Sequence, residues 1–563
     1  MTADDAAALD ARDPLAPFAA EFHHPVDPAG RRTIYLCGHS LGLQPRAAAA
    51  CIEQELAIWR DRAVLGHHDG PRAWMRYHER FASPLGELCG AMPTEVVAMN
   101  SLTVNLHLLL VSFFRPTPAR NRILIEQPAF PSDRYAVVSQ LAFHGLDASA
   151  HLVEVAPRPG EECLRTEDLL AAIERNRAHL ALVLLPGVQY LTGQCLEVAP
   201  LAAAARAAGA RIGLDLAHAI GNTPLRLHDW DVDFAVWCSY KYLNGGPGAI
   251  GGAFVHERHA RRVDLPRFAG WWGHDPDTRF AMPADFTPIA GAEGWQLSNP
   301  PVLAAAPLLA SLEILRRAGL ARLREKSLAL TGFLRRSLAQ ALPRDSLEIL
   351  TPSEPAAHGC QLSLRLRADS RRVVERLTAA GVVADWREPD VLRLAPAPAY
   401  NSFSDVRRAV TALAAAVRSW AARRHWSRWS ALDRPGRCSR SCSGAADSGS
   451  SCTRPDPIRA GIPKNPDARS TWRSAHAGSV RSSGSRSSTG CERAWCGCAA
   501  VAFMSVVAAS RCSRTGPDRT RRSTRSPAQR LDACSSTSRS PNTGSTCASS
   551  TGWRRSTGVP GTP

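Results

Sequence analysis

Lysine is the scarcest charged residue of this 563-residue chain, which holds only Lys241, Lys326 and Lys464 beside 65 arginines. An enzyme that needs a lysine to form a Schiff base therefore has very few candidates. Long apolar runs are also absent. None reaches the roughly 18 residues that a membrane-spanning helix needs, so no membrane partner is expected. The first residues are acidic and lack an apolar core, which is not the pattern of a targeting segment.

Positive charge is concentrated at one end of the chain. The net charge of +17 comes from 47 Lys+Arg against 44 Asp+Glu in residues 1–430, and 21 against 7 in residues 431–563. The first part is nearly neutral, so its charge does not favour a nucleic-acid partner. Seven of the sixteen cysteines precede residue 430, without CxxC spacing. Scattered thiols of this kind fit a reduced, cytoplasmic protein.

Short apolar segments alternate with helical segments from about residue 95 to residue 300. This alternation is typical of a mostly parallel sheet covered on both faces, with functional side chains at the carboxyl ends of its strands. The expected strands are 122–126, 181–185, 211–215, 234–238 and 252–255, and the expected helices are 104–114, 132–143 and 201–208.

A smaller α+β unit is expected from residue 301, where a long amphipathic stretch begins. Its expected elements are strands at 361–366 and 391–394 and helices at 371–380 and 404–421. We therefore expect an α/β fold with a mostly parallel central sheet flanked by helices, and a small C-terminal α+β domain. The expected divisions are an N-terminal segment (1–60), a large domain (61–300), a small domain (301–423) and a tail (424–563).

The tail is rich in serine and arginine and has no sustained hydrophobic period. Such a segment buries too little apolar surface to offset the entropy lost on ordering, so we expect disorder. Two interpretations stay open: a basic tail that binds RNA or a membrane surface, and non-native translation of an arginine-rich reading frame. Unclustered arginines, scattered cysteines and scarce lysine favour the second.

Asp215 and Lys241 are the first candidates for catalysis. Asp215 ends an apolar strand, where a carboxylate in low dielectric needs a cationic partner such as a protonated pyridine nitrogen. Lys241 follows the apolar run 233–238 and precedes a glycine-rich stretch, which suits an aldehyde cofactor held as a Schiff base. Each has an ordinary alternative: a helix cap for the acid, and a solvated surface residue for the lysine. Their order, with three lysines available, favours an enzyme that uses pyridoxal 5′-phosphate.

A phosphate site is expected at residues 100–103, immediately before a predicted helix. Hydroxyls and free backbone N–H groups at a helix N-terminus bind phosphate. Phe130 follows the next predicted strand, where its ring can stack on a cofactor. An ordinary N-cap and a core aromatic are the alternatives for these two features.

Taken together, these segments resemble the kynureninase family of fold-type-I pyridoxal phosphate-dependent hydrolases. The resemblance covers roughly residues 10–420, with the motifs in order and at compatible spacing, and the tail has no counterpart. The matching segments are LTVNLHLLLVSFF, AFPSDRYA, GVQYLTGQ, DLAHAIGN, HDWDVDFAVWCSYKYLNGGPGAIGGAFVHERH, GWWGH, SNPP and RLAPAPAYNSFSDV.

The resemblance implies a role for each matching site residue. Lys241 is implied to be the Schiff-base lysine, Asp215 the partner of the pyridine nitrogen, and Tyr240 a proton relay near the phosphate. Arg393 is implied to hold the substrate α-carboxylate through two hydrogen bonds. The other implied cofactor contacts are Leu102, Thr103, Phe130, Pro131, Ser132, Asp133, His218, Trp271 and Asn299, the last two from the neighbouring subunit of a homodimer. No metal is implied.

Two positions depart from the family pattern. Pro186 stands where the family often has a hydroxyl residue, so one side-chain contact is expected to be lost. His39 stands in the loop 38–42, which reads GHSLG where the family pattern is GNSLG-like. An altered substrate contact and a neutral change are both open for His39.

The implied reaction is hydrolysis of L-kynurenine to anthranilate and L-alanine, and of 3-hydroxy-L-kynurenine to 3-hydroxyanthranilate and L-alanine, in tryptophan degradation and in NAD synthesis through quinolinate. One alternative is another fold-type-I enzyme such as a cysteine desulfurase. That chemistry needs a mobile cysteine in a late loop, whereas Cys360 opens a predicted strand. The other alternative, a basic nucleic-acid-binding protein, rests on the tail alone, which lacks interleaved aromatic residues.

Overall fold

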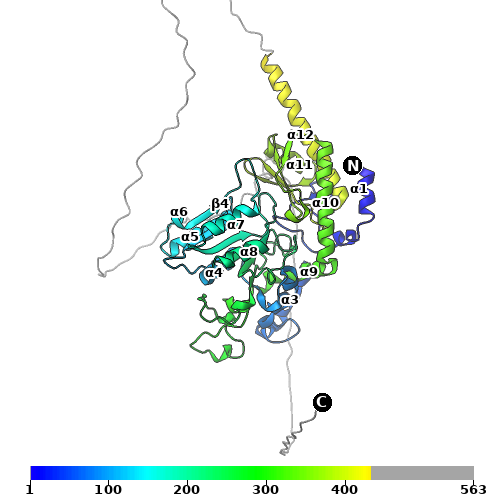
Figure 1. Ribbon diagram of the computed structural model, residues 1–563. Helices are drawn as coiled ribbons and strands as arrows, with labels where there is room; N and C mark the ends of the chain where they lie inside the picture. Colours follow the sequence, from blue (N-terminus) through cyan, green and yellow to red (C-terminus); the bar gives the residue numbers. More distant parts are fainter. Residues whose placement is uncertain (1, 433–563) are drawn as a thin grey trace, which may run out of the picture. The chain divides into compact units, whose positions relative to one another are not determined.

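The computed structural model describes residues 2–432, and its main feature is a seven-stranded sheet with strand order β2-β8-β7-β6-β5-β3-β4. Figure 1 shows this sheet with α5, α6 and α7 beside β4. The strands are β2 (Val96–Ala98), β3 (Arg122–Glu126), β4 (Leu152–Val155), β5 (Leu180–Pro186), β6 (Arg211–Asp215), β7 (Phe234–Trp237) and β8 (Gly252–Val255).

The sheet is mostly parallel, as predicted from the sequence. Strands β4, β3, β5, β6 and β7 run parallel to one another, and β8 is antiparallel to both β7 and β2. Helices connect the strands and flank the sheet. Their bounds are α2 (Ala48–Arg62), α3 (Glu79–Cys89), α4 (Leu102–Phe113), α5 (Pro131–Phe143), α6 (Ala148–His151), α7 (Thr166–Arg175) and α8 (Val198–Ala207).

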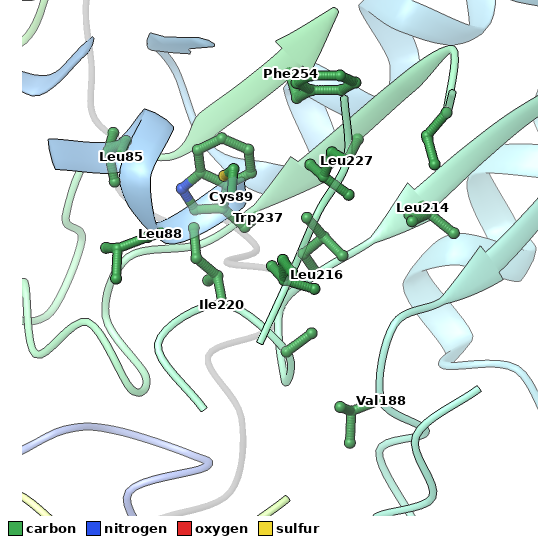
Figure 2. Close-up of a cluster of buried hydrophobic side chains, with 14 of the residues drawn as sticks. Leu85, Leu88, Cys89, Val188, Leu214, Leu216, Ile220, Leu227, Trp237 and Phe254 are labelled. Carbon is green, nitrogen blue, oxygen red and sulfur yellow. The ribbon is translucent and has the colours of Figure 1, made fainter. Parts of the chain in front are cut away.

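Neighbouring residues along the central strands pack into different apolar clusters. Leu214, Trp237 and Phe254 belong to one cluster, together with Leu85 and Leu88 of α3, and Figure 2 shows these side chains close together. Val236, next to Trp237, and Ala253 and Val255, on either side of Phe254, belong to a second cluster. Because successive side chains of a strand point to opposite faces, both faces of the sheet are buried. This double burial explains the continuous apolar runs in the sequence.

A four-stranded antiparallel sheet with order β12-β13-β10-β9 forms the second sheet of the molecule. The long stretch expected from residue 301 is divided into α9 and α10 at Gly319, whose φ of 78° suits glycine. The elements are α9 (Val302–Ala318), α10 (Leu320–Ala341), β9 (Leu347–Ile349), β10 (Leu362–Leu366), α11 (Ser370–Ala379), β11 (Val382–Val383), β12 (Asp385–Arg387), β13 (Val391–Leu394) and α12 (Phe403–Leu432).

The N-terminal segment packs against this second sheet and its helices. The carboxylate of Asp10, at the end of α1 (Ala3–Asp10), accepts the N–H groups of Phe403 and Ser404 at 2.7 and 3.1 Å, at the start of α12. Strand β1 (Ile34–Tyr35) pairs in parallel with β11. The domain divisions expected from the sequence stay predictions.

Helix α12 continues to Leu432, past residue 423, where the expected tail begins. The remainder of the expected disordered tail, residues 433–563, lies outside the described residues. Among residues 2–432, no helix combines the length and the apolar character needed to cross a membrane.

Candidate active site

One cleft opens where β3, β5, β6 and β7 end, and it collects most of the site residues expected from the sequence. Parallel strands present their carboxyl ends at one edge, so residues far apart in the chain meet there. The cleft is lined by Leu102, Thr103, Glu126, Phe130, Ser132, Asp133, Pro186, Val188, Tyr190, Asp215, Ala217, His218, Tyr240 and Lys241. Pro131, also expected at the site, is the first residue of α5 and lies between Phe130 and Ser132 in the chain.

Three buried carboxyl groups lie at one end of the cleft. Asp215 is the last residue of β6 and accepts the N–H of Ala217 at 2.6 Å. Burial, followed by the charge of Asp215, raises the pKa of Asp133 well above its ordinary value. Burial also raises the pKa of Glu126 to about 8. A nearby cation would stabilise the ionised forms of these acids, so this part of the cleft suits a cationic group.

Lys241 lies beside two aromatic rings. Its Nζ atom is 5.8 Å from the ring centroid of Phe130 and 5.9 Å from that of Tyr240. Phe130 meets Tyr190 edge to face, with ring centroids 5.3 Å apart. The amine thus faces the same space as the aromatic rings, and Phe130 can present its ring to a planar ligand.

Hydrogen-bond donors for an anion also line the cleft. The hydroxyls of Thr103 and Ser132 are 2.9 Å apart, at the starts of α4 and α5. Ser101, the N-cap of α4, makes no side-chain cap hydrogen bond, so the first N–H groups of this helix remain available to a ligand. Burial raises the pKa of Tyr240 above its ordinary value, so its hydroxyl keeps its proton.

His218 is a buried, neutral side chain in this cleft. Burial, followed by the charge of Lys241, lowers its pKa well below the ordinary value. Its Nδ1 atom has no hydrogen-bond partner within the described part of the chain. Its backbone oxygen accepts the side-chain N–H of Asn222 at 2.9 Å, which holds the loop after β6 in place.

Arg393 does not line the cleft directly. It lies in β13 with 1% of its surface exposed, and its Nη1 donates to the backbone oxygen of Tyr190 at 2.7 Å. Its Nη2 forms an ion pair with the carboxylate of Asp385. The guanidinium is therefore behind the Tyr190 wall of the cleft, with an acidic partner that the sequence did not reveal.

Trp271 and Asn299 lie away from the cleft, in a separate surface hollow that is also lined by His67, His68 and Phe280. Trp271 is 43% exposed. The structure of one chain thus does not bring these two residues to the other expected site residues.

Sequence reasoning overlooked several lining residues. Glu126 ends β3 as Asp215 ends β6, so the rule that selected Asp215 would also have found it. Tyr190 follows β5 in a loop; it lies in the matching segment GVQYLTGQ, but no role was assigned to it. Pro186 lies opposite Asp215 in the register of β5 and β6. The hydroxyl that many family members have at this position would therefore lie next to Asp215.

Comparison with known proteins identifies the family. A kynureninase from Koribacter versatilis is 54% identical over 402 residues, which cover 71% of this chain and 95% of that protein. The kynureninase of Myxococcus xanthus is 54% identical over 95% of its length, and that of Xanthomonas axonopodis pv. citri is 55% identical over 98%. The chain belongs to the kynureninase family. A family profile described as the kynureninase C-terminal domain also matches residues 323–413.

Solved structures agree with a fold-type-I architecture. A cysteine desulfurase from Escherichia coli has a TM-score of 0.59 and 18% identity, and covers 72% of this chain and 99% of its own. A cystine C–S lyase in complex with cysteine persulfide has a TM-score of 0.57 and 18% identity, and covers 68% of this chain and 97% of its own. This identity indicates the shared fold alone. Burial raises the pKa of Cys360 to about 12, which is unfavourable for a desulfurase nucleophile.

The residues of the cleft fit the pyridoxal phosphate that kynureninases use. The carboxyl groups of the cleft include the buried Asp215, which suits a pyridine N–H, and beside it Asp133, whose buried Oδ1 has no partner among the described residues. The cleft also offers two hydroxyls and a helix N-terminus for a phosphate. Lys241 lies within the same cleft, where the aldehyde would need it.

Proposed function

We propose that this member of the kynureninase family hydrolyses L-kynurenine to anthranilate and L-alanine, and 3-hydroxy-L-kynurenine to 3-hydroxyanthranilate and L-alanine. The reaction breaks the bond between Cβ and Cγ, places the oxygen of water on the released aromatic carboxylate, and places a proton on Cβ. The observation that carries the proposal is the meeting of Lys241, three buried carboxyl groups and an anion cradle in one cleft.

The residues that hold the cofactor divide between the two ends of the cleft. Asp215 holds the pyridine proton, Phe130 stacks on the ring, and Leu102 and His218 complete its walls. Thr103, Ser132 and the Tyr240 hydroxyl hold the phosphate with the N-terminal N–H groups of α4. Bound there, pyridoxal phosphate fixes the substrate amine and accepts the electron pair left when a bond to the α-carbon breaks.

Two side chains are placed to move protons. The Nζ atom of Lys241 removes the proton from the α-carbon of the substrate, for which it must be a free amine. The hydroxyl of Tyr240 keeps its proton because its pKa is raised, so it is the acid that supplies the proton for Cβ. Arg393 receives the α-carboxylate from behind Tyr190, through a planar fork of N–H donors.

A homodimer completes this proposal. Trp271 and Asn299 lie in a hollow away from their own cleft, and Trp271 and Phe280 are 43% and 56% exposed. Exposed aromatic residues of this kind favour a subunit interface. A two-fold dimer brings this hollow of one subunit to the phosphate side of the other subunit's cleft.

The cytoplasm is the proposed location. All seven cysteines within the described residues are free thiols, which fits a reducing compartment. Cell fractionation with an antibody against the chain tests this, and recovery in an oxidising compartment would contradict it.

Product analysis tests the proposed reaction. Purified protein, supplied with pyridoxal phosphate and L-kynurenine, should release anthranilate and L-alanine in equal amounts, as quantified by chromatography. The Lys326→Ala variant is a control for removal of a lysine, because Lys326 forms an ion pair with Asp13 away from the cleft. Release of sulfur from cysteine, without anthranilate from kynurenine, would favour the desulfurase alternative instead.

A further inference from the structure

Asp385 and Arg393 are neighbours across two antiparallel strands. The register of β12 and β13 sets Asp385 opposite Arg393, and the two residues are 2% and 1% exposed. The N-terminal chain reaches the same place, because the N–H of Ala395 donates to the backbone oxygen of Leu36 at 2.9 Å. This contact brings the loop that contains His39 beside the arginine.

One carboxylate oxygen, Oδ2 of Asp385, collects several donors. The Nε2 atom of His39 and the hydroxyl of Ser40 each lie 3.1 Å from it, and Arg387 Nη2 lies 3.4 Å away. The fourth donor is Nη2 of Arg393. Asp385 is therefore hydrogen-bonded both to His39 and Ser40 of the N-terminal loop and to Arg393.

His39 contributes a hydrogen bond without a charge. Burial, followed by the charges of Arg393 and Lys241, lowers its pKa well below the ordinary value, so the ring is neutral. A neutral imidazole that donates through Nε2 orients the carboxylate but leaves its negative charge for Arg393. His39 is fully buried, so water does not replace this donor.

Arg393 keeps N–H donors for a ligand, because its guanidinium has five and the contacts with Tyr190 and Asp385 use only part of them. Its Nη1 and Nη2 atoms contact Tyr190 and Asp385, whereas Nε is buried and has no partner among the described residues. A buried N–H without an acceptor is costly, and a substrate carboxylate would satisfy it. The direction in which this donor points depends on the two contacts that fix the guanidinium plane.

We propose that Asp385 is a positioning residue for Arg393, and that His39, through Asp385, helps aim the arginine at the substrate α-carboxylate. The inference rests on the proposed function, since it needs Arg393 to bind that carboxylate. The inference also gives a role to His39, which stands where the family pattern has asparagine. An asparagine amide could fill the same role, because both side chains can donate an N–H to Asp385.

Two ligands that differ only at the carboxylate test this proposal. L-alanine has the α-carboxylate, and L-alaninamide has a neutral amide in its place. Their equilibrium affinities for the cofactor-loaded protein are measured from the change in cofactor absorbance, without turnover. The ratio of the two affinities reports the carboxylate contact alone, and alaninamide binding shows that a variant is folded and loaded.

We expect Asp385→Asn to reduce the preference for L-alanine by roughly 10- to 100-fold, because an asparagine oxygen accepts a hydrogen bond from Arg393 without forming an ion pair with it. His39→Leu should reduce it by roughly 10-fold, and His39→Asn should restore most of it. Asp390→Asn is the matched control, since Asp390 lies in the same hairpin and faces Arg365 at 3.5 Å. It should behave as the wild type.

The possible outcomes separate this inference from the proposed function. If Arg393→Gln abolishes the preference but Asp385→Asn and His39→Leu keep it, the positioning role is wrong and the carboxylate role stands. If the wild-type protein shows no preference, or Arg393→Gln retains it, the role of Arg393 itself fails. If Asp385→Asn does not fold, the comparison of His39→Leu with His39→Asn alone decides whether this network positions Arg393.

Discussion

Replacing Glu126 by glutamine should change how the stability of the cofactor-free protein depends on pH. Glu126 is 4% exposed, and burial, with a smaller effect from Asp215, raises its pKa to about 8. In the unfolded chain the same carboxyl ionises near its ordinary value of 4.5. Between these values the folded protein holds a proton that the unfolded chain has lost. The free energy of unfolding therefore falls as the pH rises through this window.

The size of the effect follows from the pKa difference. A rise from the ordinary 4.5 to about 8 corresponds to about 5 kcal/mol of unfolding free energy. Most of this loss occurs between about pH 5 and pH 9. Glutamine has nearly the same shape and no charge, so the Glu126→Gln variant should lack this loss and should exceed the wild type in stability at the alkaline end.

Urea unfolding of the cofactor-free proteins, followed by tryptophan fluorescence at several pH values, measures the difference. Glu348→Gln is the control, because the Glu348 side chain is 57% exposed and contributes little to such linkage. Parallel pH dependence of the wild type and Glu126→Gln would refute the reasoning, since it would mean that Glu126 ionises alike in the folded and unfolded chains.

Three further predictions concern the reaction. Lys241→Ala should release no anthranilate while its circular dichroism and unfolding midpoint stay close to those of the wild type; clear turnover would contradict the role of Lys241 as the base. Asp215→Asn should lower turnover by roughly 1,000-fold, because the pyridine proton loses its anionic partner, and near-normal turnover would make the acid structural. Mixed dimers of Lys241→Ala and Asn299→Ala subunits should regain activity that neither variant has alone, because one hybrid cleft is intact. No recovery in confirmed mixed dimers would show that each subunit has a self-contained site.

The central strands could be predicted from the sequence because they are buried on both faces. Strands β3 and β6 begin and end at the predicted residues, because a continuous apolar run bounded by turns marks both ends of a strand in the sequence. Strand β4 was missed because only Val155 of its four residues is fully buried, so its pattern resembles that of a loop. The division of the long helical stretch at Gly319 was also missed, although glycine there gave the signal.

The site was predictable where chemistry coincides with a strand end. Asp215 ends β6 and Lys241 follows β7, and the structure brings both into one cleft. The partner of Arg393 was not predictable, because the pairing of Asp385 depends on the register of two short strands. A register of this kind is set by tertiary packing, which a single sequence does not reveal.

The most direct test of the account is to identify the lysine that binds the cofactor. The wild-type chain is incubated with pyridoxal phosphate and reduced with borohydride, and the modified peptide is identified by mass spectrometry. The account predicts a pyridoxyl group on Lys241, beside Phe130 and Tyr240 in the cleft. A pyridoxyl group confined to Lys326 or Lys464, or no modification of Lys241 in protein that converts kynurenine, would contradict it.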